Sequence, residues 1–307
     1  ARRGLNLTEV AKALHTSQPG VSKAILELEE ELGIEIFQRH GKRLKRVTEP
    51  GQHVVAAIER ILAELDNLRR IGDEFSQQER GTLSIATTHT QARYVLPEVI
   101  KAFREQYPEV RLHLHQGTSE QIGEMAALDR IDFAIATGSQ SLFEGFSLLP
   151  CYRWHRHVVV PKGHPLAKVK KPTLKQLAAH PIITYVFSFT GPSSLHDIFA
   201  KEGLVPNVVL TARDADVIKT YVRLGLGIGI VASMSVDPKD DADLVEIDTS
   251  HLFPAHVTWI GFRRGGLLRK YQLDFMQLFA PHLTRRVIER AANAATQGDV
   301  EELVKDL

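Results

Sequence analysis

The stretch from residue 81 to residue 262 alternates short apolar runs with helical sequence, and this alternation leaves few folds open to the chain. Strands are predicted at residues 82–87, 110–115, 132–137, 158–160, 182–187, 208–211, 229–232 and 256–262. Helical sequence lies between several of them, residues 91–107 included. Alternating strands and helices build parallel sheets covered on both faces, so the fold class is α/β. This stretch is longer than one small sheet requires, so we expect two Rossmann-like lobes.

Two proline-containing segments mark the expected boundary between these lobes. We expect a hinge near Leu149-Pro150 and a return of the chain near residues 251–254. The first lobe is therefore predicted to comprise residues 81–150 plus 257–307, and the second lobe residues 151–256. A cleft between two such lobes is the usual place for a small ligand.

A helical segment precedes the lobes. Val10 and Leu14 share one face of a first helix, and Ser17 is suited to cap a second, because its hydroxyl can accept from free backbone N–H groups. Pro19 follows at a position where its missing N–H costs nothing. Two short helices across a tight turn predict a helix-turn-helix, whose second helix enters the major groove of DNA. An ordinary helical hairpin is the alternative interpretation.

The polar residues that begin the second helix are suited to base edges and phosphates: Ser17, Gln18, Ser22 and Lys23. Residues 38–47 then carry a local charge of +5 with no acidic residue, and Gly41 interrupts them as the tip of a hairpin would. The basic residues of this segment are Arg39, Lys42, Arg43, Lys45 and Arg46. A basic wing beside a helix-turn-helix makes phosphate contacts, which position a protein on DNA without reading its sequence.

A long helix with a heptad pattern follows Pro50. Its seam positions are Val54, Ile58, Ile61, Leu65, Leu68 and Phe75. About three heptads of this pattern favour a coiled coil between two chains, and an amphipathic helix packed on its own domain is the alternative. We expect a winged helix-turn-helix domain at residues 1–49 and a dimerising linker helix with a linker at residues 50–80.

The composition excludes several classes of protein but does not by itself assign a function. The 307 residues hold 38 Lys and Arg against 37 Asp and Glu, a net charge of +1, so any basic footprint is local. The single cysteine, Cys151, excludes an internal disulfide framework. No apolar run approaches the ~20 residues of a spanning helix, and the start lacks an export signal. We expect a cytoplasmic protein without a membrane segment.

Hydroxyl and amide side chains cluster where predicted strands end and helices begin. Residues 87–91, 137–139 and 189–194 all have this layout. The free N–H groups of a helix start, flanked by such side chains, form an anion site without net positive charge. Plain helix capping is the alternative for each segment alone. Three of them on facing lobes indicate a small polar or anionic ligand.

Enzyme and metal interpretations have less support. Cys151 lies in no nucleophile motif, and residues 225–229 resemble a nucleotide loop but follow a helix and enter a strand, as a helix stop does. The pairs His113/His115 and His155/His157 could bind metal, but a third ligand at recognised spacing is missing. We expect no catalytic residue, no metal site and no cofactor apart from a small-molecule effector.

The sequence resembles the LysR-type transcriptional regulators. In the first domain the resemblance lies in residues 16–23, Leu26-Glu27-x-Glu29, residues 32–39 and residues 47–51. In the lobes, residues 85–94 and 214–225 resemble the branch that activates the cysteine regulon. So do Leu149-Pro150-Cys151-Tyr152, residues 260–264 and residues 279–284. The likeness runs from about Asn6 to Thr284.

This resemblance implies a homotetramer that binds promoter DNA and works with RNA polymerase to control sulfur assimilation and cysteine biosynthesis. It implies acetylserine, sulfate or thiosulfate as effector. The effector positions that it implies are Thr88, Thr90, Gln91, Thr137, Thr190 and Trp154. It adds Thr16 and Pro19 to the DNA-contacting residues.

Two departures from the family pattern leave alternatives open. Only Ala1-Arg2-Arg3-Gly4 stands where the family has a further helix, so we expect the chain as given to bind DNA poorly. Residues 138–141 and Ser188 differ from the branch, which leaves open a sibling that governs the use of organic sulfonates. A two-lobed solute-binding protein is the rival from another class, but it would leave the basic helical region unexplained.

Overall fold

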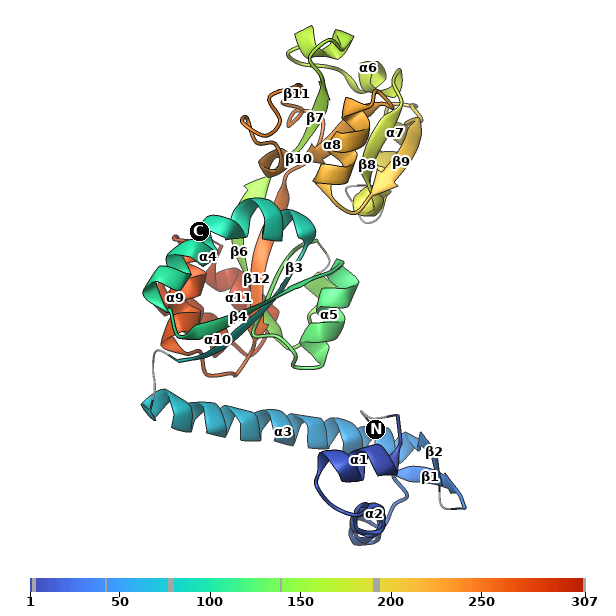
Figure 1. Ribbon diagram of the computed structural model, residues 1–307, viewed down its shortest axis with the longest axis vertical. Helices are drawn as coiled ribbons and strands as arrows, with labels where there is room; N and C mark the ends of the chain where they lie inside the picture. Colours follow the sequence, from blue (N-terminus) through green and yellow to red (C-terminus); the bar gives the residue numbers. More distant parts are fainter. Residues whose placement is uncertain (2–3, 42, 77–79, 139, 190–193, 306–307) are drawn as a thin grey trace. The chain divides into compact units, whose positions relative to one another are not determined.

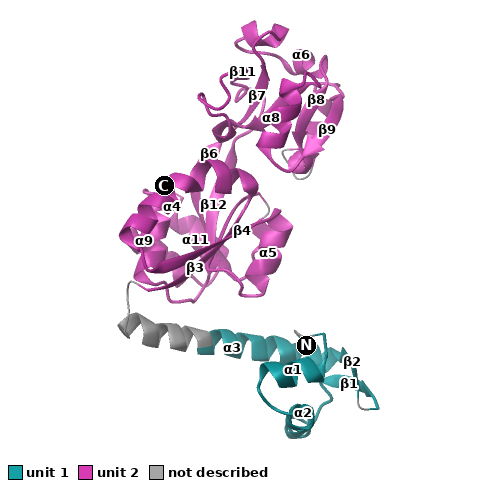
Figure 2. Ribbon diagram, in the orientation of Figure 1, with its two compact units in different colours: residues 1–73 teal, residues 74–307 magenta. Residues whose placement is uncertain are grey.

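In the computed structural model the chain forms two compact units, residues 1–73 and 74–307 (Figures 1 and 2). The structure describes residues 1, 4–41, 43–76, 80–138, 140–189 and 194–305, with side chains described as far as Leu65 in the helix that spans the unit boundary. Each unit is described by itself below. No helix in these ranges has both the length and the apolar character needed to cross a membrane.

The N-terminal unit has the predicted helix-turn-helix with a two-stranded wing. Its elements are α1 (Leu7–Ala13), α2 (Gln18–Leu32), β1 (Phe37–His40), β2 (Arg43–Val47) and α3 (Glu49–Ser76). The Ser17 hydroxyl accepts from the Gly20 N–H at 3.2 Å, which confirms it as the cap of α2. Gly33 ends α2 in the left-handed conformation, and Gly41 joins β1 to β2 with φ of +59°.

Apolar side chains of this unit are only partly covered. Leu7, Ala11 and Ile36 are its buried hydrophobic residues among those described. On α2, Leu26 and Leu32 are about half exposed, and on the described part of α3 the seam residues Ile58, Ile61 and Leu65 are exposed with Leu62. An apolar stripe left in contact with water is typical of a helix that packs on a partner.

The C-terminal unit contains two five-stranded sheets, and their mixed direction corrects the prediction of parallel sheets. The first sheet, in the order β4-β3-β5-β12-β6, consists of β3 (Gly81–Thr87), β4 (Val110–Gln116), β5 (Phe133–Thr137), β6 (Phe146–Trp154) and β12 (His256–Arg263). β12 is antiparallel to both β5 and β6 because the chain re-enters this sheet from the other lobe.

The second sheet has the order β11-β7-β10-β8-β9. It consists of β7 (Arg156–Pro161), β8 (Ile182–Tyr185), β9 (Val208–Ala212), β10 (Ile228–Ala232) and β11 (Leu244–Ile247). β8 is parallel to β9 and β10, but β7 is antiparallel to β10 and β11. β8 ends at Tyr185, two residues before the predicted end, because residues 186–189 turn into a short 3-10 helix.

The predicted hinge at Leu149-Pro150 lies inside β6, a strand that the sequence patterns missed. β6 pairs with β12 as far as Trp154 opposite His256, so the chain leaves the first sheet only at His155. It returns between Ile247, the end of β11, and His256. In the following paragraphs the first lobe is the first sheet with its helices, and the second lobe is the second sheet with its helices (Figure 1).

Helices pack on each sheet and position the strand ends. In the first lobe they are α4 (Leu96–Gln106), α5 (Ser119–Ala127), α9 (Lys270–Phe279), α10 (Arg285–Ala292) and α11 (Gln297–Leu303). In the second lobe they are α6 (Leu174–Ala178), α7 (Leu195–Ala200) and α8 (Ala215–Arg223). Gly225, with φ of +77°, follows α8, which confirms residues 225–229 as a helix stop before a strand.

The tail beyond Thr284 lies outside the stretch of sequence that resembles the family, and in the structure it is part of the first lobe. Ile288, Ala291 and Val300 are fully buried in its core. The Ser147 hydroxyl of β6 donates to the Ala291 carbonyl at 2.7 Å, and Gln297 exchanges two hydrogen bonds with the backbone of Leu148. The tail therefore supports β6, the strand that leads to the second lobe.

We expect Ile288→Ala to destabilise the C-terminal unit by about 2–4 kcal/mol, because it leaves a cavity under β6. Urea denaturation followed by the fluorescence of the two tryptophans, Trp154 and Trp259, measures this, since both lie on the first sheet. The exposed neighbour Arg286→Ala is the control and should stay within about 0.5 kcal/mol of wild type. Equal effects of the two substitutions would show that the tail is not part of the folded core.

Candidate functional site

Residues predicted to contact DNA gather at the start of α2 and on the wing. Thr16, Ser17, Lys23 and Arg43 are exposed, and Gln18 and Pro19 occupy the first turn of α2. Ser22 is half-buried, and Lys42 lies outside the described residues. Side chains at the N-terminal end of a recognition helix are those that reach base edges in the major groove.

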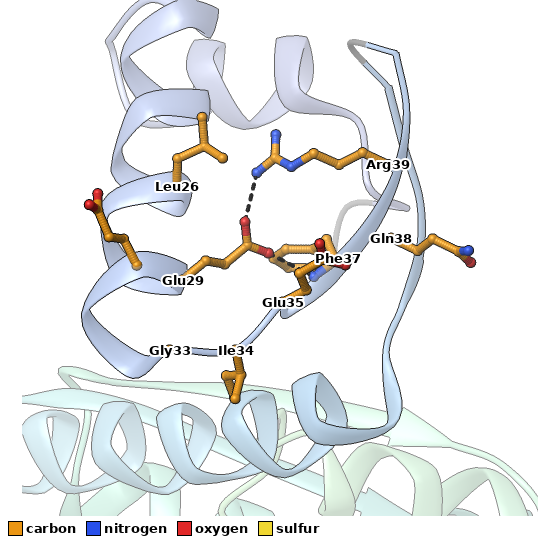
Figure 3. A pocket seen from close by; sticks show the side chains of 9 residues that line it. Leu26, Glu29, Gly33, Ile34, Glu35, Phe37, Gln38 and Arg39 are labelled. Carbon is orange, nitrogen blue, oxygen red and sulfur yellow. Dashed lines mark hydrogen bonds and ion pairs between the residues drawn. The ribbon is translucent and has the colours of Figure 1, made fainter.

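Arg39 differs from the other predicted DNA-contacting residues because it is tied into the fold. Figure 3 shows its guanidinium extending from β1 toward α2, where it lies 3.1 Å from the buried carboxylate of Glu29. The other oxygen of Glu29 accepts from the backbone N–H groups of Ile36 and Phe37 at 2.8 and 2.9 Å. Arg39 thus holds the wing against the recognition helix, and Arg43, Lys45 and Arg46 present exposed charges.

Glu29 stays ionised in this setting. Burial by itself would raise the pKa of the carboxyl group, but the Phe37 amide, the Arg39 guanidinium and the Ile36 amide outweigh it and lower the pKa. An open groove of about 670 Å³ lies beside this ion pair (Figure 3). It is lined by Leu26, Glu29, Glu30, Gly33, Ile34, Glu35, Phe37, Gln38 and Arg39. With Glu30 and Glu35 exposed at it, this groove is not suited to DNA phosphates.

A network of side-chain hydrogen bonds joins three of the predicted effector residues with residues not predicted. It lies where β5, β6 and β12 run side by side, next to the π-helix η1 (Gln91–Val95). The buried hydroxyl of Thr258 is its centre: Gln91 Nε2 and Trp154 Nε1 lie 3.2 Å from it, and Thr137 Oγ1 lies 3.0 Å from it. Either hydroxyl can be the donor between Thr258 and Thr137, and Trp154 Nε1 also lies 3.3 Å from Thr137 Oγ1.

Tyr152 extends this network and Tyr185 lies at the neighbouring residue Thr90, and neither tyrosine was predicted. The Tyr152 hydroxyl donates to Gln91 Oε1, and burial raises the pKa of Tyr152, so the group remains protonated. Tyr185, at the end of β8 in the second lobe, bonds through its hydroxyl to the Thr90 side chain and accepts from the Ala232 N–H at 3.1 Å. Thr90 therefore connects the two lobes.

The remaining predicted effector residues have separate surroundings. Thr88 is half-buried at the end of β3, and its carbonyl accepts from the Ala92 N–H at 3.1 Å. Thr190 lies outside the described residues. Ser194, at the edge of the same segment, is a plain helix cap, as the alternative interpretation had it, because its hydroxyl accepts from the Asp197 N–H.

Charged contacts also cross between the lobes. The Tyr94 hydroxyl donates to the Asp216 carboxylate at 2.5 Å, and Arg93 lies 3.6 Å from the same carboxylate. Lys219 lies 3.6 Å from Asp216 and 5.0 Å from the centre of the Tyr94 ring. His89 lies near Asp216 too, at 3.8 Å.

The same group is the one set of three metal-type ligands among the described residues: His89, Asp214 and Asp216. The ammonium and guanidinium groups beside Asp216 already neutralise its charge, so a cation has little to gain there. His157, from a predicted pair, lies against Glu246 and Asp248 instead. Cys151 is buried, and burial raises the pKa of its thiol, which makes it unreactive.

Comparisons with known proteins agree with this architecture. Residues 1–52 match the bacterial regulatory helix-turn-helix proteins of the lysR family, and residues 76–284 match the LysR substrate binding domain. The chain is a LysR-type transcriptional regulator. It is 48% identical over 305 residues to the regulator CysB of Haemophilus influenzae, covering 99% of this chain and 94% of that one.

Other relatives support the same family. The regulator SsuR of Burkholderia cenocepacia is 51% identical over 287 residues, with 94% of this chain and 93% of that one covered. The solved cofactor-binding domain of the Cbl regulator is 46% identical, with a TM-score of 0.65, and the match covers 70% of this chain and 95% of that one. A LysR-type regulator is a DNA-binding protein with an effector domain and is not an enzyme, and the chain is similar to the sulfur-related regulators CysB, SsuR and Cbl.

We expect Glu29→Gln to reduce the stability of the N-terminal unit by about 1–3 kcal/mol at neutral pH, because the charged bond to Arg39 is lost. Since the native pKa of Glu29 lies below its ordinary value of 4.5, this stabilisation is present above pH 4.5 and is lost as pH falls through the native pKa. The difference between wild type and Glu29→Gln should therefore shrink in acid.

Hydrogen-exchange protection of residues 18–47 measures this effect in the full chain. Glu30→Gln, an exposed neighbour on α2, is the matched control and should exchange like wild type. A difference between Glu29→Gln and wild type that is the same at neutral and acid pH would contradict the role of the carboxylate charge.

Proposed function

We propose that this LysR-type regulator controls genes of sulfur assimilation and cysteine biosynthesis in response to acetylserine, sulfate or thiosulfate. The observation that carries the proposal is the hydrogen-bond network around Thr258, in which Gln91, Thr137 and Trp154 offer neutral donors at one point of the first sheet. An effector with several oxygen atoms can accept these hydrogen bonds in place of the Thr258 hydroxyl. The similarity to CysB and SsuR supports the sulfur role.

Neutral donors suit these ligands. A sulfur oxyanion carries its charge on oxygens that each accept two or more hydrogen bonds, and hydroxyl, amide and indole donors meet them without burying a cation. Residues 88–91, at the entry to the helical segment η1–α4, add backbone N–H groups to the set. Thr190 is proposed as a further donor from the second lobe.

Effector binding acts on DNA binding through the arrangement of the two lobes. Thr90 and Tyr94, on either side of Gln91 in the first lobe, bond to Tyr185 and Asp216 in the second lobe. A ligand that bonds Gln91 therefore affects the segment that holds the lobes together. Only a difference in affinity between two lobe arrangements shifts their populations, so tight binding to both would have no effect.

The DNA contacts are assigned to the recognition helix and the wing. Ser17, Gln18, Ser22 and Lys23 face base edges and phosphates, and Thr16, Pro19, Lys42 and Arg43 complete the surface. Arg39 contributes by holding the wing in place. We propose that the protein acts in the cytoplasm as a homotetramer, paired through the exposed stripe of α3, and contacts RNA polymerase at its promoters.

We expect Thr88→Val and Thr137→Val each to weaken effector binding by about 1–3 kcal/mol, because each removes a donor from a buried anion. Calorimetric titration with sulfate, thiosulfate and N-acetylserine in phosphate-free and sulfate-free buffer measures the affinities. Thr82→Val, exposed at the other end of β3, is the matched control and should bind like wild type. Wild-type affinity in both site variants would place the effector elsewhere, and binding of an organic sulfonate alone would favour the sulfonate-responsive sibling.

We expect Ser22→Ala combined with Lys23→Ala to remove sequence-specific operator binding, at a cost of about 1–3 kcal/mol for each lost base contact. Fluorescence anisotropy with an operator selected by the wild-type protein measures this, and effector affinity should be unchanged. Lys168→Ala removes the same charge from an exposed site in the second lobe and serves as control. Operator binding that survives the double substitution would rule out this helix as the recognition helix.

A further inference from the structure

A second pocket lies in the first lobe and shares no residue with the network around Thr258. It is open to solvent and has a volume of about 310 Å³, which is the size at which small-molecule sites begin. It forms where η2 (Gln140–Leu142) leads into β6, next to the end of β12 and the start of α11. Its lining residues are Gln140, Ser141, Phe143, Glu144, Gly145, Phe146, Leu148, Arg264 and Gln297.

The half-buried guanidinium of Arg264 is the cationic group of this pocket. Nη1 donates to the Ala295 carbonyl at 3.1 Å, and Nη2 donates to the Phe146 carbonyl at 2.6 Å. The Nε atom is buried and has no hydrogen-bond partner among the described residues. The two neutral carbonyls fix the position of the guanidinium, but they bring no negative charge and leave the Nε–H group without an acceptor. Such a group is suited to a ligand oxygen that carries negative charge.

Two carboxylates lie near Arg264, and neither forms an ion pair with it among the described contacts. Hydrogen bonds from the Thr296 hydroxyl and amide lower the pKa of Asp299, and Arg264 adds to this lowering from beyond ion-pair distance. Glu144 is exposed at the pocket, and the Arg264 N–H donates to the carbonyl of the next residue, Gly145, at 2.9 Å. The pocket therefore presents a carboxylate and a guanidinium from neighbouring segments that are not bonded to each other.

Neutral polar groups and apolar side chains complete the pocket. Gln140 and Ser141 are exposed, and both belong to the segment that departs from the pattern of the family branch. Gln297 is fixed by its hydrogen bonds to the backbone of Leu148 and lies beyond residue 284, where the match to the LysR substrate binding domain ends. The buried apolar side chains are Phe143, Phe146 and Leu148. This pocket is thus built partly from sequence outside the family pattern.

We propose that this pocket is a second ligand site of the protein and that it binds a small α-amino acid. The carboxylate of such a ligand accepts from the N–H groups of Arg264, and its ammonium group donates to Glu144. One zwitterion compensates both charges at once, which neither a simple anion nor a simple cation does. Gln140 and Ser141 are the groups available to a short polar side chain of the ligand.

Trp259 lies next to the pocket and can report on its occupancy. The Phe143 ring packs edge-on against the Trp259 indole, with ring centres 4.6 Å apart. Trp259 Nε1 also lies 3.3 Å from the carbonyl of Gly138, two residues before Gln140. Because the chain has two tryptophans, Trp154→Phe leaves Trp259 as the single emitter. A ligand that contacts Phe143 should therefore change the fluorescence of this variant.

Calorimetric titration of the full-length protein with L-serine and L-alanine tests the site. Each amino acid is compared with an analogue that lacks the ammonium group, 3-hydroxypropionate or propionate, and with one that lacks the carboxylate, ethanolamine or ethylamine. We expect an amino acid to bind and both of its analogues to bind at least about tenfold more weakly, because each analogue leaves one charged group of the pocket without a partner.

Two variants each remove one of the charged partners. Arg264→Gln should weaken amino-acid binding about tenfold or more, because it removes the charged donors to the carboxylate. Glu144→Gln should weaken it about fivefold, since an ion pair at an exposed side chain contributes less. Glu144 is exposed, so this variant tests the site even if Arg264→Gln fails to fold. Glu124→Gln is the matched control, because Glu124 is an exposed residue of the same lobe that does not line the pocket.

Three results would overturn the site. The first is that neither amino acid binds to the wild-type protein or changes the fluorescence of Trp154→Phe. The second is that Glu144→Gln binds the amino acid like wild type and like Glu124→Gln. The third is that an analogue with a single charge binds as tightly as its parent amino acid. The titrations with sulfate, thiosulfate and N-acetylserine test the proposed function separately, so either inference can fail without the other.

Discussion

The antiparallel entry of β12 between β5 and β6 is the constraint on which the candidate effector site depends. Its register places Thr258 opposite Thr137 on one side and Tyr152 on the other, and a shift by one residue would turn the Thr258 hydroxyl to the opposite face. Gln91 and Trp154 then have a common acceptor, which orients both side chains. Because β12 is also the strand by which the chain returns from the second lobe, the same strand positions the donors and connects the lobes.

Local patterns predicted the parts of the fold that have local causes. The cap at Ser17, the stop at Gly225 and the hydroxyl-rich strand end at Thr88 each follow from chemistry within a few residues. Thr258 and Tyr185 could not be found in this way. Each lies in or at the end of an apolar strand, where its hydroxyl has no partner nearby in sequence, and its role arises from residues more than ninety positions away. The antiparallel pairing of β12 could not be predicted either, because it depends on strands that lie far away in the sequence.

The N-terminal unit shows what a charge count leaves out. Five basic residues between 38 and 47 predicted a wing that makes phosphate contacts, and the structure adds that one of them, Arg39, pairs with Glu29, ten positions earlier on α2. The family motif contained both residues, but only the fold brings them together. The remaining charges on β2 are carried by a wing whose position this ion pair and the bonds from Glu29 to the β1 backbone determine. The position of the wing therefore depends on an acidic residue of α2.

The π-helix η1 links a predicted effector residue, Gln91, to the contacts between the lobes. A π-turn inserts one residue into a helix and is found often at functional sites, since the extra residue redirects the side chains around it. Here Gln91 enters the network around Thr258, and Tyr94 bonds to Asp216 in the second lobe. Gln91 and Tyr94 lie in the same short turn, so a displacement of its backbone moves both side chains. Because the two contacts share one turn, coupling between the network and the lobe contacts needs no longer chain of residues.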